Sequence, residues 1–146
     1  MAALNEELLN SWLDLSLAVI NEKLVSHIPY NDSLICNILN RHAKENNPHP
    51  MTATRLCDMT RMQKSQMNRT LSAMEKRGLI YRERSLEDRR QIFVYLNPAA
   101  DSLYFKQHQK MLSLVDRIIE RMGEDKAKDV AETLRFVAST AENIIK

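Results

Sequence analysis

A short segment of this sequence combines helical periodicity with side chains that could contact nucleic acid. Within residues 63–77, Met67, Leu71 and Met74 recur at i, i+4 and i+7, which places them on one face of a helix. The polar residues of the opposite edge are Lys64, Ser65, Gln66, Asn68 and Arg69. Side chains of these types donate hydrogen bonds to phosphates and to base edges in the major groove of DNA. We therefore predict a helix that buries one face and offers a polar, basic edge to DNA.

A second basic group lies in and beside a loop that follows this helix. Residues 79–84 and 91–96 have the alternation of strands, and the loop between them contains neither glycine nor proline. The basic residues here are Arg82, Arg84, Arg89 and Arg90. Adjacent arginines at a hairpin tip suit a narrow minor groove, whose negative potential attracts them. A solvated, salt-bridged hairpin is the alternative, and the position of the loop directly after the predicted DNA-contacting helix favours the first interpretation.

The segment before the DNA-contacting helix completes a known order of elements. Thr52 is a good N-cap for a short helix over 53–59, whose Leu56 and Met59 would pack against the next helix. Gly78 stands where a helix commonly ends in a left-handed turn. Helix, turn, helix and hairpin in this order predict a winged helix-turn-helix, in which the first helix supports the second.

The run from Lys64 to Leu96 resembles the signature of the MarR family of bacterial transcription regulators. The matching pieces are Ser65 and Arg69, then Met74-Glu75-Lys76-Arg77-Gly78-Leu79-Ile80, Arg82, and Asp88-Arg89-Arg90. Two positions depart from the family pattern. Arg61 stands in the turn where a small residue is usual. After the hairpin, family members usually have Leu-Thr-x-x-Gly, whereas this chain has Leu96-Asn97-Pro98-Ala99-Ala100. Asn97 can still cap a helix, and Pro98 suits its first position.

The resemblance implies a homodimeric regulator, acting as a repressor on a near-palindromic operator in double-stranded DNA. It also implies that Asp88 braces the hairpin and that Arg90 reaches the minor groove; we assign Arg82, Arg84 and Arg89 to phosphates. The predicted DNA-binding residues are Thr52, Lys64, Ser65, Gln66, Asn68, Arg69, Arg82, Arg84, Asp88, Arg89 and Arg90.

Charge is distributed unevenly along the 146 residues. The net charge is +2, but residues 61–90 hold nine Lys and Arg against four Asp and Glu, so the rest of the chain is net negative. A charge run alone is usually a solvated face. Together with the helix-turn-helix pattern, it favours nucleic acid as the partner.

Long amphipathic helices are predicted at both ends of the chain. Residues 3–27, 98–122 and 125–145 carry more apolar surface than a winged helix needs; a further helix, 33–44, has Asp32 as its expected N-cap. We predict a mainly α (α+β) fold in which residues 1–30 and 98–146 form a helical dimerisation region. Residues 31–97 would form the DNA-binding lobe of the same protomer. Burial of these helices within one chain is the alternative.

The sequence offers few residues for metal binding, cofactor binding or catalysis. Cys36 and Cys57 form no C-x-x-C pair, and four scattered histidines (His27, His42, His49 and His108) form no ligand cluster, so we expect no metal. Two glycines in total exclude a Gly-rich cofactor loop, and no catalytic motif is present, so we expect neither cofactor nor enzyme activity. Without a signal peptide or a membrane-length apolar run, we expect a cytoplasmic protein.

Members of the resembling family often bind small aromatic molecules between the dimerisation helices and the DNA-binding lobe. The corresponding side chains here are Trp12, His27, Tyr30, Met59 and Met62. The alternative is that they are ordinary core residues. Two other functions stay open: a winged-helix protein-interaction module without an operator, and a thiol- or metal-triggered sensor on the same fold.

Overall fold

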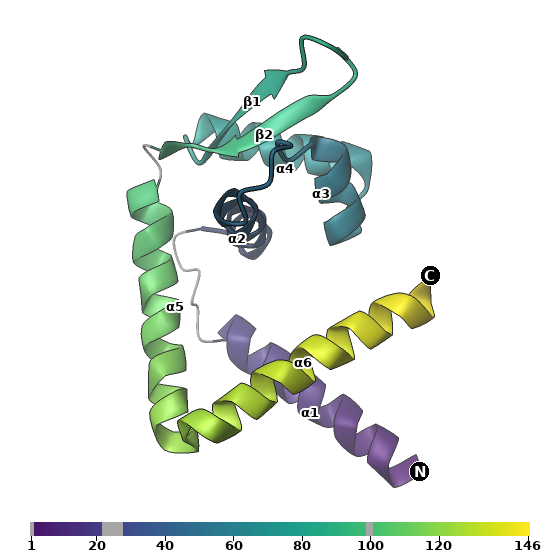
Figure 1. The fold of residues 1–146 in the computed structure, drawn as a ribbon, viewed down its shortest axis with the longest axis vertical. Helices are drawn as coiled ribbons and strands as arrows, with labels where there is room; N and C mark the ends of the chain where they lie inside the picture. Colours follow the sequence, from purple (N-terminus) through teal and green to yellow (C-terminus); the bar gives the residue numbers. More distant parts are fainter. Residues whose placement is uncertain (1, 22–27, 99–100) are drawn as a thin grey trace. The chain divides into compact units, whose positions relative to one another are not determined.

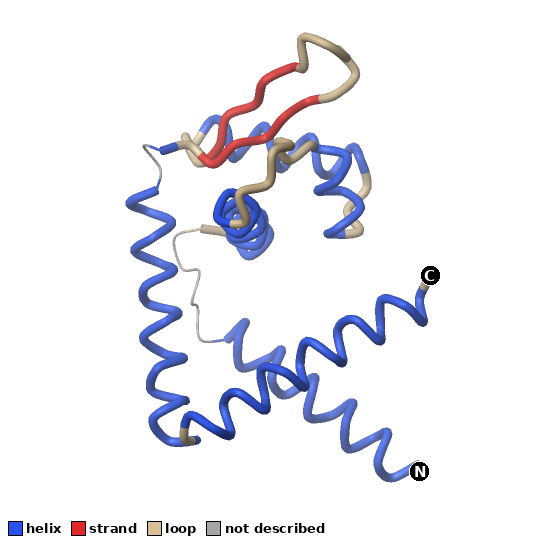
Figure 2. Tube along the Cα trace, in the orientation of Figure 1, coloured by secondary structure: helices blue, strands red, loops and turns tan. Residues whose placement is uncertain are grey.

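Six helices and one small antiparallel sheet make up the computed structural model, which describes residues 2–21, 28–98 and 101–146. The elements in order are α1 (Ala2–Asn21), α2 (Tyr30–Lys44), α3 (Ala53–Thr60), α4 (Lys64–Lys76), β1 (Ile80–Arg84), β2 (Ile92–Leu96), α5 (Asp101–Met122) and α6 (Glu124–Ile145) (Figure 1). Most of the described residues are helical, and β1 and β2 form the only sheet among them (Figure 2). The predicted mainly α fold with a winged helix-turn-helix is confirmed. Residues 1–107 and 108–146 form separate compact units, and the boundary falls within α5.

The turn between α3 and α4 forms although its sequence is unusual. Thr52 caps α3 as predicted, its Oγ1 accepting a hydrogen bond of 3.1 Å from the backbone N–H of Arg55. At the other end, Arg61 adopts φ 60°, a left-handed conformation that costs energy for a residue with a Cβ. This geometry explains why a small residue would suit the position. Leu56, Met67 and Leu71 are fully buried and join the two helices.

The end of α4 leads directly into the sheet. Gly78 has φ 75°, its N–H bonds to the Glu75 carbonyl, and the N–H of Leu79 bonds to the Met74 carbonyl at 2.9 Å. This pair of bonds is the Schellman arrangement, which closes a helix and turns the chain back. The predicted role of Gly78 is confirmed.

The sheet is a hairpin in which Ile80 pairs with Leu96 and Arg84 pairs with Ile92. Residues 51–52 extend it, because the N–H of Val94 donates to the Met51 carbonyl and Thr52 bridges to Phe93. The residues buried around this hairpin, α2, α3, α4 and the start of α5 form one core: Ile28, Ile35, Cys36, Leu39, Met51, Leu56, Met67, Leu71, Met74, Leu79, Ile80, Val94 and Tyr104.

The start of α2 differs from the prediction. Asp32 is not the N-cap: the helix begins two residues earlier, at Tyr30, and Pro29 precedes it. Asp32 instead lies in the first turn, where its buried carboxylate forms an ion pair with Arg77 at the end of α4. A tertiary partner has therefore replaced the local capping bond that the sequence pattern indicated.

The apolar faces of the terminal helices lie open in the single chain. Leu8 and Trp12 on α1, Val115 on α5, and Leu134 and Phe136 on α6 are each about half exposed or more. None of the residues of α6 is buried. Of the helices in the described ranges, none has the length and apolarity needed to cross a membrane.

Candidate nucleic-acid interface

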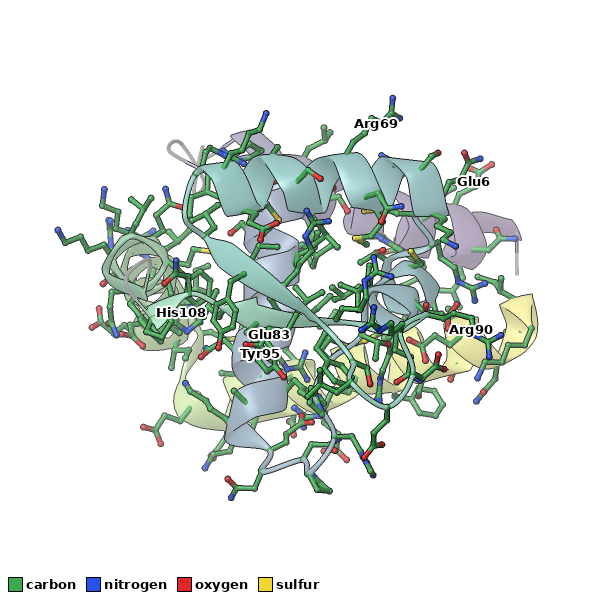
Figure 3. All side chains as sticks on the ribbon, turned by 90° about the horizontal axis from the view of Figure 1, so that it is seen from above. Glu6, Arg69, Glu83, Arg90, Tyr95 and His108 are labelled. Carbon is green, nitrogen blue, oxygen red and sulfur yellow. The ribbon has the colours of Figure 1, made fainter. Side chains whose placement is uncertain are left out.

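Helix α4 presents two unlike faces. Met67, Leu71 and Met74 are fully buried, whereas every residue of the predicted DNA-contacting edge is exposed: Lys64, Ser65, Gln66, Asn68 and Arg69. Figure 3 shows Arg69 projecting outwards from the helix. Within the described part of the chain, the side chains of Lys64 and Arg69 take part in no ion pair or hydrogen bond. This edge is therefore available to an external partner.

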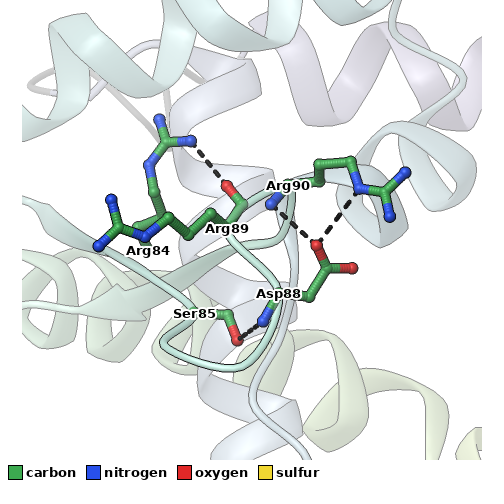
Figure 4. A network of polar contacts seen from close by, with 5 residues as sticks. All are labelled: Arg84, Ser85, Asp88, Arg89 and Arg90. Carbon is green, nitrogen blue, oxygen red and sulfur yellow. Dashed lines mark hydrogen bonds and ion pairs between the residues drawn. The ribbon is translucent and has the colours of Figure 1, made fainter.

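The loop of residues 85–91 between the strands, which we call the wing loop, is held by its own hydrogen bonds. Asp88 Oδ1 accepts from the backbone N–H of Arg90 at 3.0 Å and from its Nε at 3.4 Å (Figure 4). The backbone N–H of Asp88 donates to Ser85 Oγ at 3.1 Å, and Arg84 Nη1 donates to the Arg89 carbonyl at 2.7 Å. Two backbone bonds of 2.9 Å, from Ser85 to Gln91 and from Gln91 to Asp88, complete the network.

These bonds leave the arginines of the wing loop on the outside. The side chain of Arg90 is 95% exposed despite its contact with Asp88, and Arg89 is also exposed. A loop whose backbone is already ordered can offer such charges without a further entropic cost for fixing the loop. The wing loop is thus preorganised for an anionic partner.

Arg82 lies in a different environment from the other arginines. Its side chain is about a quarter exposed, and its Nε and Nη2 contact Glu75 Oε2 at 2.8 and 2.7 Å. A further bond of 3.2 Å joins Nη2 to Ser72 Oγ. Arg82 therefore fastens β1 to α4, a positioning role that sequence reasoning missed. Glu75, the only acidic residue in α4, was the available signal.

The outer face of the hairpin is aromatic and acidic. Tyr81 and Tyr95 pair across the strands and stack with ring centroids 4.9 Å apart, and Glu83 lies opposite Phe93. Burial, then the negative charge of Glu83, then Tyr81, raise the pKa of Tyr95 above its usual value. Figure 3 shows Glu83 and Tyr95 close together on this face. This face of the hairpin therefore differs in character from the polar, basic edge of α4.

The residues of the predicted effector site do not form an enclosed group in the single chain. Trp12, Tyr30 and Met59 are each more than half exposed, while Met62 packs against the core. His27 lies outside the described residues. The effector site stays a prediction.

The cysteines and the described histidines lie apart from one another or make other contacts. Cys36 is buried and Cys57 is half-buried, and neither forms a disulfide. His42 Nε2 lies 2.7 Å from the His49 carbonyl, so this contact joins α2 to the following loop. In the ranges that the structure describes, no three His, Cys, Asp or Glu side chains are grouped so that they could hold a metal ion.

Buried Tyr104 at the start of α5 attaches that helix to α2. Its hydroxyl donates to Asn37 Oδ1 at 3.1 Å. Burial is the largest cause that raises the pKa of Tyr104, followed by the nearby Cys36 thiol, while a hydrogen bond with Asn40 acts in the opposite direction.

Comparison with known proteins agrees with this arrangement. No curated protein matches the sequence, but residues 42–91 match the model of the MarR family. The structure is similar to Staphylococcus aureus MarR in complex with salicylate and kanamycin, at 23% identity and TM-score 0.75, covering 96% of this chain and 93% of that one. It is also similar to Streptococcus pneumoniae FabT in complex with DNA, at 18% identity and TM-score 0.72, with 99% of both chains covered.

A third solved structure has the same fold. The transcriptional regulator BldR from Sulfolobus solfataricus is 18% identical, with TM-score 0.70 and 93% of this chain and 95% of that chain covered. At these identities the structures establish the fold. The matched segment 42–91 contains α3, α4, β1 and the wing loop, and it ends just before β2. Residues 42–91 thus match the model of the MarR family, and the chain has the winged helix-turn-helix fold of these solved structures.

Proposed function

We propose that this protein is a sequence-specific DNA-binding transcription regulator that acts as a homodimeric, ligand-responsive repressor. The observation that carries the proposal is the exposed, unpaired polar edge of α4 beside a preorganised wing loop. An interaction module with no nucleic-acid partner would have no need for this combination. The complex of Streptococcus pneumoniae FabT with DNA supports it by analogy of fold.

The chemistry of each side chain indicates which part of the DNA it would contact. Lys64, Ser65, Gln66, Asn68 and Arg69 would read base edges in the major groove. Arg89 and Arg84 would contact phosphates, giving affinity that weakens with salt, and Arg90 would respond to minor-groove width. Thr52 and Arg82 would act indirectly, because they hold α3 and β1 in place.

Dimerisation is proposed from the exposed apolar faces of α1, α5 and α6. Two-fold symmetry would present two α4 helices about one DNA turn apart and so select a near-palindrome. A small aromatic effector would act by changing that separation, because only one separation fits successive major grooves. The salicylate complex of Staphylococcus aureus MarR supports this class of effector.

The test is fluorescence anisotropy of the purified protein with DNA from upstream of its own gene, against random DNA, across a salt series. We expect much tighter binding to the upstream fragment, at two chains per site. Equal and steeply salt-dependent binding to both would place the operator elsewhere. A folded protein that binds neither would contradict the proposal and favour a winged-helix protein-interaction module.

A further inference from the structure

The wing loop carries an apolar side chain at an unusual place. Leu86 is 97% exposed, more than any other large hydrophobic residue in the described part of the chain. A single exposed leucine is common on protein surfaces and by itself implies nothing. This leucine, however, lies in a loop with two exposed arginines, beyond the last strand pair of Arg84 and Ile92.

The conformation around Leu86 is fixed by its neighbours. Ser85, the preceding residue, is buried, and its backbone N–H and its Oγ bond to the Gln91 carbonyl and the Asp88 N–H. Arg84 holds the far side of the loop through the Arg89 carbonyl. With its backbone held on both sides, the leucine extends into solvent from an ordered support, so little loop entropy opposes its burial against a partner.

We propose that Leu86 is an apolar wedge that enters the minor groove of the operator and partly unstacks one base step. This inference rests on the proposed DNA-binding function. Minor-groove proteins use leucine and similar side chains in this way, and arginines are drawn to the same groove by its negative potential. The wing loop would supply both parts: Arg90 for attraction and Leu86 for deformation.

The wedge would give sequence preference without a hydrogen bond to any base. Pyrimidine–purine steps unstack more easily than others, so the position under Leu86 should favour such a step. Burial of the leucine against sugar and base edges would also remove its apolar surface from water, which is favourable because the side chain is now almost fully exposed. Leu86 would therefore determine specificity at a position that α4 does not read.

The experiment begins with an operator obtained by selection from random duplexes with the wild-type protein. Hydroxyl-radical footprinting then locates the minor groove that the wing loop covers. 2-Aminopurine, whose fluorescence rises on unstacking, is placed at each step there in turn. The variants are Leu86→Met, which keeps an apolar side chain of similar reach, and Leu86→Gln, which keeps its size but makes it polar. Both should unfold at the wild-type temperature, because the side chain is almost fully exposed.

We expect a rise in fluorescence at one step with the wild type and with Leu86→Met. Leu86→Gln should lose that rise and bind about tenfold more weakly, the factor for the loss of a leucine-sized burial. Tight binding to the selected operator with no rise at any step, or with the same rise for Leu86→Gln, would overturn the wedge and leave the proposed function standing. Failure of the selection to enrich any sequence would overturn both.

Discussion

Arg90 carries its charge on the outside of a loop that already has its shape. Its backbone N–H, not its guanidinium, makes the shorter bond to Asp88, so truncation of the side chain leaves that bond in place. We therefore expect Arg90→Ala to weaken DNA binding while the unfolding temperature stays within about 2 °C of the wild type, as for surface substitutions.

Anisotropy with a selected operator and thermal unfolding by circular dichroism measure the two quantities for Arg90→Ala. Arg90→Lys is the matched control, because it keeps the charge but loses the planar guanidinium. Partial recovery by lysine would indicate attraction by charge. Unchanged affinity in Arg90→Ala would remove the wing loop from the DNA interface.

Arg69 allows a test of base reading, since it projects from the exposed edge of α4 and has no side-chain partner among the described residues. If it reads a base edge, Arg69→Ala should cost about 1–3 kcal/mol of binding and relax the preference at one position. Competition with operators changed one base pair at a time measures that preference. An equal loss on every sequence would instead identify Arg69 as a phosphate contact.

Arg61 shows what the sequence could and could not reveal at this scale. Its departure from the family pattern identified an unusual turn, and the structure explains it by a positive φ. We expect Arg61→Gly to raise the free energy of unfolding by about 1 kcal/mol, because glycine adopts this conformation without the Cβ penalty. Urea denaturation measures the change, with Arg61→Ala as a control that keeps the Cβ. A gain in stability for alanine equal to that for glycine would contradict the explanation.

At the scale of helices and strands, local signals were sufficient where local bonds decide the structure. Thr52 as an N-cap and Gly78 as the end of α4 were both predicted, because each acts within a few residues of itself. Asp32 and Arg82 were assigned other roles, because their partners, Arg77 and Glu75, lie on different elements. Periodicity reveals which face of a helix is buried, but it does not reveal which charged groups meet across that face.

The ion pair between Asp32 and Arg77 connects α2 to the end of α4. Its two partners differ in burial, so loss of the arginine should destabilise the fold by leaving a buried charge. Asp32 is buried, whereas the Arg77 side chain is 42% exposed. Arg77→Met would leave a buried carboxylate without its partner, so we expect a loss of about 2 kcal/mol, below the value for fully buried pairs because solvent screens the arginine. Asp32→Asn/Arg77→Met should recover part of that loss, since it removes the unpaired charge.

Urea denaturation of both single variants and the double variant measures this coupling. If the double variant lost as much free energy of unfolding as the two single variants together, the two side chains would have no measurable coupling energy.

For the whole molecule, the sequence predicted a winged helix-turn-helix flanked by long amphipathic helices at both ends of the chain. The structure has this order of elements, with α1 before it and α5 and α6 after it. Sequence periodicity predicted the apolar faces of α1, α5 and α6, and these faces are exposed in the single chain. The division into a dimerisation region, 1–30 with 98–146, and a lobe, 31–97, stays a prediction. Periodicity predicts which face of a helix is apolar, but the group that packs on that face depends on tertiary and quaternary contacts, which periodicity does not specify.

Dimerisation can be tested through Leu134, which lies on the apolar stripe of α6 and is 49% exposed. If a second copy covers this face, Leu134→Glu would bury a charge in the interface, which costs several kcal/mol unless the charge is paired. We expect the wild type to sediment at twice its chain mass of 17.0 kDa and the variant to sediment as a monomer at micromolar concentration. Leu86→Glu introduces the same charge at an exposed leucine of the wing loop and should leave the dimer intact.

The two variants also separate assembly from DNA contact. A monomer of Leu134→Glu would hold only one α4 helix against DNA, so it should lose the preference for a palindrome while keeping salt-dependent binding to a half-site. Leu86→Glu should behave in the opposite way, with a normal sedimentation coefficient and weakened binding. If Leu134→Glu stayed dimeric and bound the palindrome normally, this stripe of α6 would lie outside the interface, and α1 and α5 alone would have to join the two chains.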